Sequence, residues 1–546
     1  MSERDNNNIR QSAESLLRRE LRSYCASESI SEEGLRQIIE RHKCTPNNNW
    51  NVRDYAFFRA ACYNEDVDEG IIQCLLEYFP SGANATDQDG SSPLHLACSN
   101  TNVTLKIVQL LIDAAPDSVR RVDINGSMPL HCLCMNTELD GIAGLEILKL
   151  LIERHQDAVR HVDNDGFLPI HMAGGQGRRS PEFCRVFIEA CPGSERMTDE
   201  DGVLPIHYAC MYNTVATVQY LYKLHPDAIN TTGDRKYPIH LAIRGVNHRD
   251  SPIAAVDIVK FLLDCDPNVK LQKYEGMVSV SLLHFACRWG YNDSTIEAAL
   301  EMIKVIYDAY PEAIEGDAIA SHIHEYHEQV QAFVNSQLVY ARQAKDYRQM
   351  TTPDGNGQLP LHTALQSNVR LGSIKLLVKG NSLAVQYPDN SGALPLHVAC
   401  QLHDSVNVIQ YLVGLDATTL DAVDHEGNSA LHLACHRARH EIIVTLLETY
   451  DAVSVSKRNA QKKLPIDLLF ESSLVPDRES VDYTETVYRL LRAYPEMVMN
   501  SINMQKQQTN LALGSCPSQN GKKRKFGHDS SGMRAVCTHQ CSATSK

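Results

Sequence analysis

The sequence lacks the features that mark membrane proteins, secreted proteins and common enzymes. No apolar run reaches the roughly 18 residues that span a bilayer, and residues 1–10 are too polar for a secretory signal. There is no Gly-x-x-x-x-Gly-Lys-Ser/Thr loop, no Gly-x-Gly-x-x-Gly after a strand, no nucleophile elbow and no kinase motif set. We therefore expect an intracellular protein, cytoplasmic or nuclear, that is not an enzyme, needs no cofactor and does not enter a membrane.

The charge of the chain is unevenly distributed. The 546 residues carry a net charge of −15, and residues 514–546 sum to +5, which leaves −20 for the rest. An acidic body lacks the basic footprint that binds phosphate backbones. We therefore do not expect nucleic acid as a partner.

One twelve-residue stretch recurs along the chain. It is clearest from Asp199 to Cys210 and returns at residues 87–98, 163–174, 389–400 and 424–435. A histidine marks each copy: His95, His131, His171, His207, His240, His284, His362, His397 and His432. Successive histidines lie 33 to 44 residues apart, except for one gap of 78. This spacing predicts a repeat array with one unit lost or replaced.

Each copy has the same internal order. Asp-x-x-Gly is typical of a turn, in which Asp bonds its own backbone and Gly takes a positive φ. Pro then opens a short helix, and a longer helix with paired leucines follows and often ends at a proline. The cysteine three residues after the histidine is expected to be a small buried side chain with a reduced thiol. Because the histidines share one slot, we interpret them as structural, not catalytic.

This pattern resembles the ankyrin repeat. The matching residues are Asp87, Gly90, Pro93, Leu94, His95 and Ala97 in one unit, and Asp424, Gly427, Leu431, His432 and Ala434 in another. The resemblance implies an all-α helix-turn-helix repeat solenoid of about 10–11 units with a helical insertion. One departure is that leucine, as in Leu168 and Leu204, takes the slot where the family usually has Thr before Pro.

The expected organisation has five segments. They are residues 1–48, two amphipathic N-terminal helices; 49–316, a first repeat block; 317–352, a long helical insertion without Gly or Pro; 353–500, a second block; and 501–546, a disordered basic tail. The N-terminal helices either cap the open end of the array or form a separate docking segment. The insertion either fills the gap between the blocks or projects as a docking element.

Two groups of residues carry competing interpretations. His322, His324 and His327, with Glu325 and Glu328, form either a solvated polar face or part of a metal site, for which a fourth ligand is missing. The run Lys522, Lys523, Arg524 and Lys525 is a nuclear-import candidate, a solubilising charge cluster or a nucleic-acid contact.

The resemblance also implies where a partner binds, because the family's contacts come from the turn tips and the end of the short helix. Carried over slot by slot, these residues are Gln88, Asp89, Ser91, Ser99, Asn100, Glu200, Asp201, Val203, Met211, Tyr212, Arg288, Trp289, Gln401, Leu402, His425, Glu426, His436 and Arg437. Trp289 is the main candidate, since tryptophan is enriched at binding hot spots. The alternative is that Trp289 packs on the next unit.

The sequence therefore predicts a non-enzymatic, monomeric scaffold or adaptor that binds a protein partner on the concave repeat surface. Two other functions stay open. One is a metal-dependent or enzyme-associated regulatory subunit, and the other is a nuclear regulatory protein imported through the basic tail.

Overall fold

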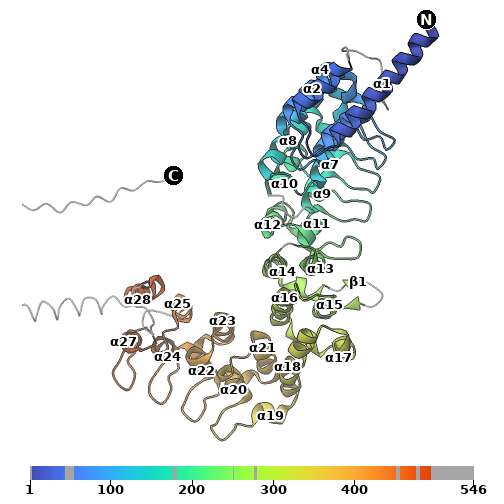
Figure 1. The fold of residues 1–546 in the computed structure, drawn as a ribbon. Helices are drawn as coiled ribbons and strands as arrows, with labels where there is room; N and C mark the ends of the chain where they lie inside the picture. Colours follow the sequence, from blue (N-terminus) through green and yellow to red (C-terminus); the bar gives the residue numbers. More distant parts are fainter. Residues whose placement is uncertain are drawn as a thin grey trace, which may run out of the picture. The chain divides into compact units, whose positions relative to one another are not determined.

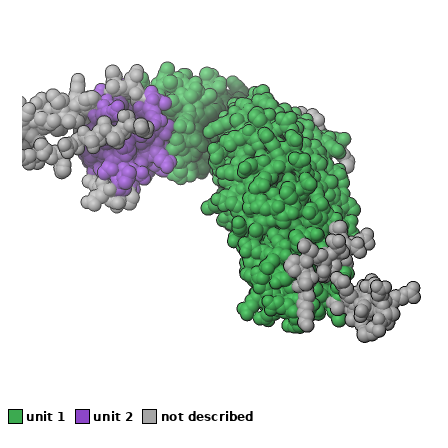
Figure 2. Space-filling model, turned by 90° about the horizontal axis from the view of Figure 1, so that it is seen from above, with its two compact units in different colours: residues 1–425 green, residues 426–546 purple. Residues whose placement is uncertain are grey.

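The computed structural model describes residues 3–42, 55–175, 181–249, 251–272, 274–275, 279–449, 455–474 and 480–493. The chain has two compact units, Met1–His425 and Glu426–Lys546 (Figure 2). The start of the expected first repeat block around Trp50 and the expected basic tail from residue 501 lie outside the described residues.

Unit 1 is built from helix pairs, each a short helix followed by a second helix. The pairs before the insertion are α3 (Ala56–Tyr63) with α4 (Glu69–Tyr78), α5 (Pro93–Ser99) with α6 (Leu105–Ala114), α7 (Pro129–Met135) with α8 (Gly141–Arg154), α9 (Pro169–Gly175) with α10 (Pro181–Ala190), α11 (Pro205–Tyr212) with α12 (Val215–Leu224), α13 (Pro238–Arg244) with α14 (Ile253–Cys265), and α15 (Leu282–Arg288) with α16 (Ile296–Ala309). After it come α20 (Pro360–Gln366) with α21 (Leu371–Gly380), and α22 (Pro395–Leu402) with α23 (Val406–Leu415).

The pairs stack into two layers (Figure 1). From α3 to α15, each short helix packs on the short helix of the next pair, and from α4 to α16 each second helix packs on the next second helix. The apolar side chains between the layers form the core, and Ile107, Val108 and Leu111 of α6 are all buried there. The predicted all-α repeat solenoid is therefore confirmed, with eleven pairs among the described residues of both units.

Local sequence explains where the helices begin and end. Pro93 occupies the first turn of α5, where its missing N–H removes no hydrogen bond. The Thr104 side chain caps α6 by accepting a hydrogen bond from the Ile107 N–H. Five of the prolines that were expected to end second helices open a short 3₁₀ helix, as in Pro116–Arg120 and Pro311–Glu315. This turn was not predicted from the sequence.

The first two helices continue the two layers at the N-terminal end. Helix α1 (Glu3–Cys25) packs on α3, and α2 (Glu32–Arg41) packs on α4. Leu17 and Leu21 of α1 and Leu35 and Ile39 of α2 are buried in these contacts. The pair thus covers apolar surface that the first repeat would otherwise expose.

A different arrangement separates α16 from α20. It contains α17 (Asp317–His322), a 3₁₀ helix (Ile323–Glu325), α18 (Glu328–Lys345) and α19 (Tyr347–Thr351). Helix α18 packs on both α16 and α21, while α16 and α21 also touch each other directly. The second-helix layer therefore continues across this segment. Between α14 and α15, the turn is replaced by a two-stranded antiparallel hairpin of β1 (Tyr274–Glu275) and β2 (Ser279–Val280).

Unit 2 has the same type of helix pair. Its described helices are α24 (Ala430–His436), α25 (His440–Thr449), α27 (Pro465–Glu471) and α28 (Val481–Ala493). Helix α24 packs on α27, and α25 packs on α28. The two-layer stacking of unit 1 thus recurs within unit 2.

Candidate protein-binding surface

The turns between repeats form fingers whose tips are joined by backbone hydrogen bonds. In the first finger, the Asp87 carboxylate accepts hydrogen bonds from the N–H groups of Asp89 and Ser91, and Gly90 has a φ of +77°. The Ile124 N–H of the next finger then donates to the Asp89 carbonyl at 2.6 Å. The same link joins Asn164 N–H to the Asn125 carbonyl at 2.9 Å. The tips therefore present their side chains in a row at a fixed spacing.

Most of the predicted tip residues are accessible. Gln88, Asp89, Glu200, Asp201, His425 and Glu426 are exposed, and Ser91 is half-buried. Val203 is different, because its side chain is only 7% exposed and its N–H donates to the Asp199 carboxylate at 2.8 Å. Val203 therefore shapes the finger and is not available to a partner, contrary to the prediction.

The residues that end the short helices divide in the same way. Ser99, Arg288 and His436 are exposed, and Tyr212, Trp289, Gln401, Leu402 and Arg437 are half-buried. Two further predictions in this group are wrong, since Asn100 is 3% exposed and Met211 is 8% exposed. Met211 is one of the buried residues of α11, which packs between α9 and α13 in the short-helix layer.

Asn100 belongs to a structural ladder that joins successive repeats. Its side-chain amide donates to the carbonyls of Cys62 at 3.1 Å and Asn64 at 2.7 Å in the preceding repeat. Asn136 and Asn213 likewise donate to carbonyls of the repeat before their own, and Asn64 donates to the carbonyls of Cys25 and Ser27 at the end of α1. These amides satisfy carbonyls that the ends of short helices leave without intrahelical partners. An asparagine five residues after the histidine slot in two adjacent units was the signal that could have revealed this ladder.

Several of the repeat histidines form a second ladder. The His95 Nδ1 accepts a hydrogen bond from the Ser92 N–H at 3.2 Å, and its Nε2 donates to the Ser127 carbonyl of the next finger at 3.1 Å. His171 and His207 have the same two kinds of partner. Burial lowers the pKa of His207 to about 4. A neutral imidazole whose two nitrogens are both engaged is a structural link, as the sequence predicted, and cannot act as a base.

Trp289 lies directly after α15, in a cluster of aromatic and basic side chains. Its ring centroid is 5.8 Å from that of Phe285, and the Arg244 guanidinium lies 4.9 Å from the Trp289 ring centroid. Beside them, the ring of Tyr212 lies 5.8 Å from the ring of His248. We call these five residues the aromatic patch. They come from the C-terminal ends of α11, α13 and α15 and the turn after α13, which stack as consecutive short helices.

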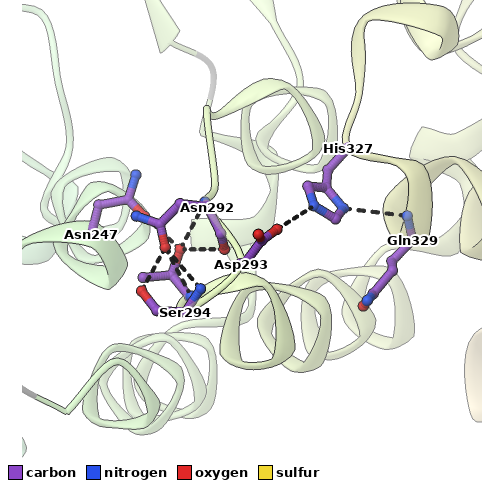
Figure 3. Close-up of polar contacts among 7 residues, drawn as sticks. Asn247, Asn292, Asp293, Ser294, His327 and Gln329 are labelled. Carbon is purple, nitrogen blue, oxygen red and sulfur yellow. Dashed lines mark hydrogen bonds and ion pairs between the residues drawn. The ribbon is translucent and has the colours of Figure 1, made fainter.

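Polar contacts fix the loop that follows Trp289 (Figure 3). The Asn247 side chain donates to the Gly290 carbonyl at 2.7 Å and accepts from the Thr295 hydroxyl at 2.9 Å. Within the loop, the Asn292 carboxamide oxygen accepts from the Ser294 N–H at 3.0 Å. The loop directly after Trp289 is therefore tied to the preceding repeat as well as to itself.

The structure gives no support to a metal site among its described residues. No group of three or more His, Cys, Asp or Glu side chains comes together there in a way that could hold an ion. His322 lies against His284, with ring centroids 5.4 Å apart. His327 caps α18 by accepting the Gln329 N–H, and its Nε2 lies 4.0 Å from an Asp293 carboxylate oxygen. His324 and Glu328 are exposed side chains in the same segment.

Two further features are the length and hydrophobicity of the helices and the burial of the cysteines. No described helix is both long enough and apolar enough to cross a bilayer. None of the thirteen described cysteines forms a disulfide, and all but Cys265 are buried. Burial raises the pKa of the Cys210 thiol to about 12. The prediction that the repeat cysteines are small buried side chains is confirmed.

Comparison with known protein families agrees with this geometry. A family model described as ankyrin repeats (3 copies) matches residues 57–145, 141–232, 176–270 and 318–421, and an ankyrin repeat model matches residues 426–460. The fourth match begins within α17, so it includes α18 and α19. No curated protein matches the chain. Ankyrin repeats generally serve as protein-binding scaffolds, and the matches include no catalytic domain. Since the matches span more than half of its length, the chain belongs to the ankyrin-repeat family.

Proposed function

We propose that this protein is a non-catalytic adaptor that binds a protein partner through the aromatic patch and the neighbouring finger tips. The observation that carries the proposal is the environment of Trp289. Its indole is half-buried and contacts both the Arg244 guanidinium and the Phe285 ring. Tryptophan, tyrosine and arginine supply most hot-spot energy in protein interfaces, particularly where they are held in position before binding.

The exposed finger tips provide a second contact region. Glu200 and Asp201 lie on the finger that precedes α11, which contributes Tyr212 to the patch. A partner seated on the patch would meet these acidic tips at its rim, where charges mainly affect association rate and orientation. Gln88, Asp89, Ser91, Ser99, Arg288, Gln401, Leu402, His425, Glu426, His436 and Arg437 stay in the proposal as secondary contacts.

The test is a comparison of bound proteins captured from native extract by the wild type and by Trp289→Ala. Loss of a hot-spot tryptophan weakens binding by about 2 kcal/mol or more, roughly thirtyfold, so specific partners should disappear from the variant. Tyr347→Ala is the matched control, because Tyr347 is 75% exposed on α19, away from the patch. A folded Trp289→Ala that retains every partner refutes the proposal. Loss of its cooperative melt assigns Trp289 to packing instead.

A separate proposal concerns location in the cell. The run Lys522–Lys525 has the composition of a nuclear-import signal, although it lies outside the described residues. We propose that the adaptor reaches the nucleus through this run. Alanine at all four positions should then exclude a fluorescent fusion from the nucleus, and an unchanged nuclear signal would contradict the idea.

A further inference from the structure

At α15 the histidine ladder loses both of its bonds, whereas His131 and His362 lose only the bond at Nε2 and keep the one at Nδ1. His95, His171 and His207 each donate from Nε2 to a carbonyl on the finger of the following repeat, at 3.1, 3.0 and 3.2 Å. After α15 and α16 no finger follows, because the chain enters α17 and the 3₁₀ helix Ile323–Glu325. His284 occupies the ladder slot on α15, but the acceptor that the slot normally faces is absent.

His284 is consequently a buried imidazole without a hydrogen-bond partner in the protein. Its exposed fraction is 2%, and neither ring nitrogen is bonded. Tyr326, which is 4% exposed, faces it with a ring centroid distance of 6.2 Å, and its hydroxyl is also buried without a partner. Buried polar groups are almost always hydrogen-bonded, so two unpaired groups at one contact require an explanation.

The closest ring to His284 is a second histidine. The centroid of His322 lies 5.4 Å away and the two planes are inclined by 33°. The Ser321 hydroxyl lies 2.9 Å from the His322 Nδ1. Two imidazolium ions at this separation repel each other strongly inside a protein, whereas two neutral rings stack without penalty. The contact is therefore compatible with the neutral pair and not with the doubly charged pair.

The charged groups around the pair do not cancel this repulsion. Arg288 on α15 adds positive charge and forms an ion pair with Glu325 at 3.3 Å, so that carboxylate is already engaged. From α13, the His240 ring lies 5.0 Å from the ring of Phe285, the residue after His284. On the other side of the segment, the Asp293 carboxylate lies 4.0 Å from His327, but it is fully exposed, so its charge is screened by solvent. Burial, His322 and Arg288 all lower the pKa of His284, and Glu325 opposes them.

We propose that the contact between His284 and residues 319–327 is a proton-sensitive latch. While both imidazoles are neutral, Tyr326 and His322 cover His284 and hold this segment on α15. Uptake of solvent protons by His284 and His322 separates them and releases the segment, which exposes Tyr326 and breaks the Arg288–Glu325 pair. No covalent bond changes, so the latch closes again when the pH rises.

Protonation breaks a hydrogen bond in the intact ladder but not at His284. In the ladder, charging His207 means breaking the hydrogen bond that its Nδ1 accepts from the Leu204 N–H at 3.1 Å, inside a tightly packed pair of repeats. At His284 no hydrogen bond has to be broken, and only one short segment has to move. The latch should therefore open at a higher pH than the one at which the repeats unfold.

Hydrogen exchange of the full-length chain, corrected for the intrinsic pH dependence of exchange, tests the latch. Between pH 7.5 and 5.5, protection should fall about tenfold or more in peptides covering residues 319–327. Peptides from α7 and α11 report the general acid destabilisation of the repeats, so residues 319–327 should lose protection at a higher pH than they do. In a Trp50→Phe background, the fluorescence of Trp289, next to Arg288, should change over the same pH range.

Variants separate the latch from general acid sensitivity. His284→Phe and His322→Gln should each abolish the pH-dependent loss of protection, whereas His324→Gln, an exposed histidine two residues away, should leave it unchanged. If His284→Phe does not fold, the pH dependence of protection in His322→Gln alone tests the latch. Constant protection of residues 319–327 in the wild type, or a pH response that survives His322→Gln, overturns the proposal.

Discussion

The regular repeats from α5 to α14 and the junction of α16, α18 and α21 are held together in different ways. In the regular repeats, the same side chain recurs in several units and makes the same bond to its neighbour, as His95 and Asn100 do. At the junction, each contact occurs once. The Tyr307 hydroxyl lies 2.8 Å from the Ser373 hydroxyl, which donates to the Gln337 side chain at 2.6 Å.

The junction also contains an ion pair and a close approach between the backbone of α21 and α16. Arg370 pairs with Asp308 at 2.7 Å, and the same carboxylate accepts the Gly372 N–H at 2.8 Å. A Cβ on Gly372 would lie 2.5 Å from the Tyr307 ring, so only glycine permits this approach of α21 to α16. The comparison shows that a repeat array can continue past a lost unit, provided that unique contacts replace the missing ladder bonds.

The largest loss of stability is expected from removing the Tyr307 side chain at the junction. Tyr307 is fully buried, so Tyr307→Ala should lower the free energy of unfolding by about 3–5 kcal/mol. Because repeat arrays gain stability from neighbouring interfaces, the loss should separate one urea transition into two, measured by circular dichroism. Tyr307→Phe removes only the hydroxyl and should keep a single transition. A single transition in Tyr307→Ala would mean that the junction does not couple the repeats on its two sides.

Breaking one bond of the regular ladder should have a smaller effect. Asn100→Ala leaves the buried carbonyls of Cys62 and Asn64 without their donor, which should lower stability by about 2 kcal/mol. Gln88→Ala, at an exposed finger tip, serves as the control and should change stability by less than about 0.5 kcal/mol. Equal urea midpoints for the two variants would show that the asparagine ladder contributes little.

Acid should weaken the regular repeats through their histidines. The pKa of His207 is about 4 in the fold against 6.5 when unperturbed, so below pH 6.5 the unfolded chain binds a proton that the folded chain does not. Stability is therefore complete above pH 6.5 and falls towards pH 4, by up to about 1.4 kcal/mol per pH unit for each such histidine. Urea midpoints from pH 7 to 4.5 measure the slope. His207→Gln should reduce it, and an unchanged slope would exclude His207 as a source.

The smallest effect is expected from the exposed ion pairs at the junction. Lys379 and Glu312 lie 3.1 Å apart, and the Lys379 side chain is 66% exposed. Lys379→Gln should change the free energy of unfolding by no more than about 0.5 kcal/mol. A loss comparable to that of Asn100→Ala would place this pair among the contacts that hold the junction together.

The sequence predicts the repeated parts of the fold and misses the unique ones. Helix starts at Pro93, the turn at Gly90 and the role of His95 follow from residues close together in the chain, and the repetition confirms each signal several times. The Tyr307–Ser373 contact joins residues 66 positions apart and occurs once, so no local pattern announces it. The same holds for the side chain of Met211, whose burial depends on how adjacent helices pack.

The site is less predictable than the fold for the same reason. Family slots place Gln88, Asp89, Glu200 and Asp201 on the accessible tips, but they do not distinguish Ser99, which is exposed, from the adjacent Asn100, which is buried. Trp289 could be named from its rarity, whereas its contacts with Arg244 and Phe285 required the structure.

The buried cysteines allow the local opening of individual repeats to be measured by thiol labelling. Cys98, Cys134, Cys210, Cys287, Cys400 and Cys435 lie in the short helices of different repeats, and all are inaccessible in the closed structure. A thiol reacts with an alkylating reagent only when it is exposed and deprotonated. The labelling rate of each cysteine in the native protein therefore measures how often its own repeat opens. A partner that stabilises one stretch of the array would protect the thiols of that stretch and leave the others unchanged.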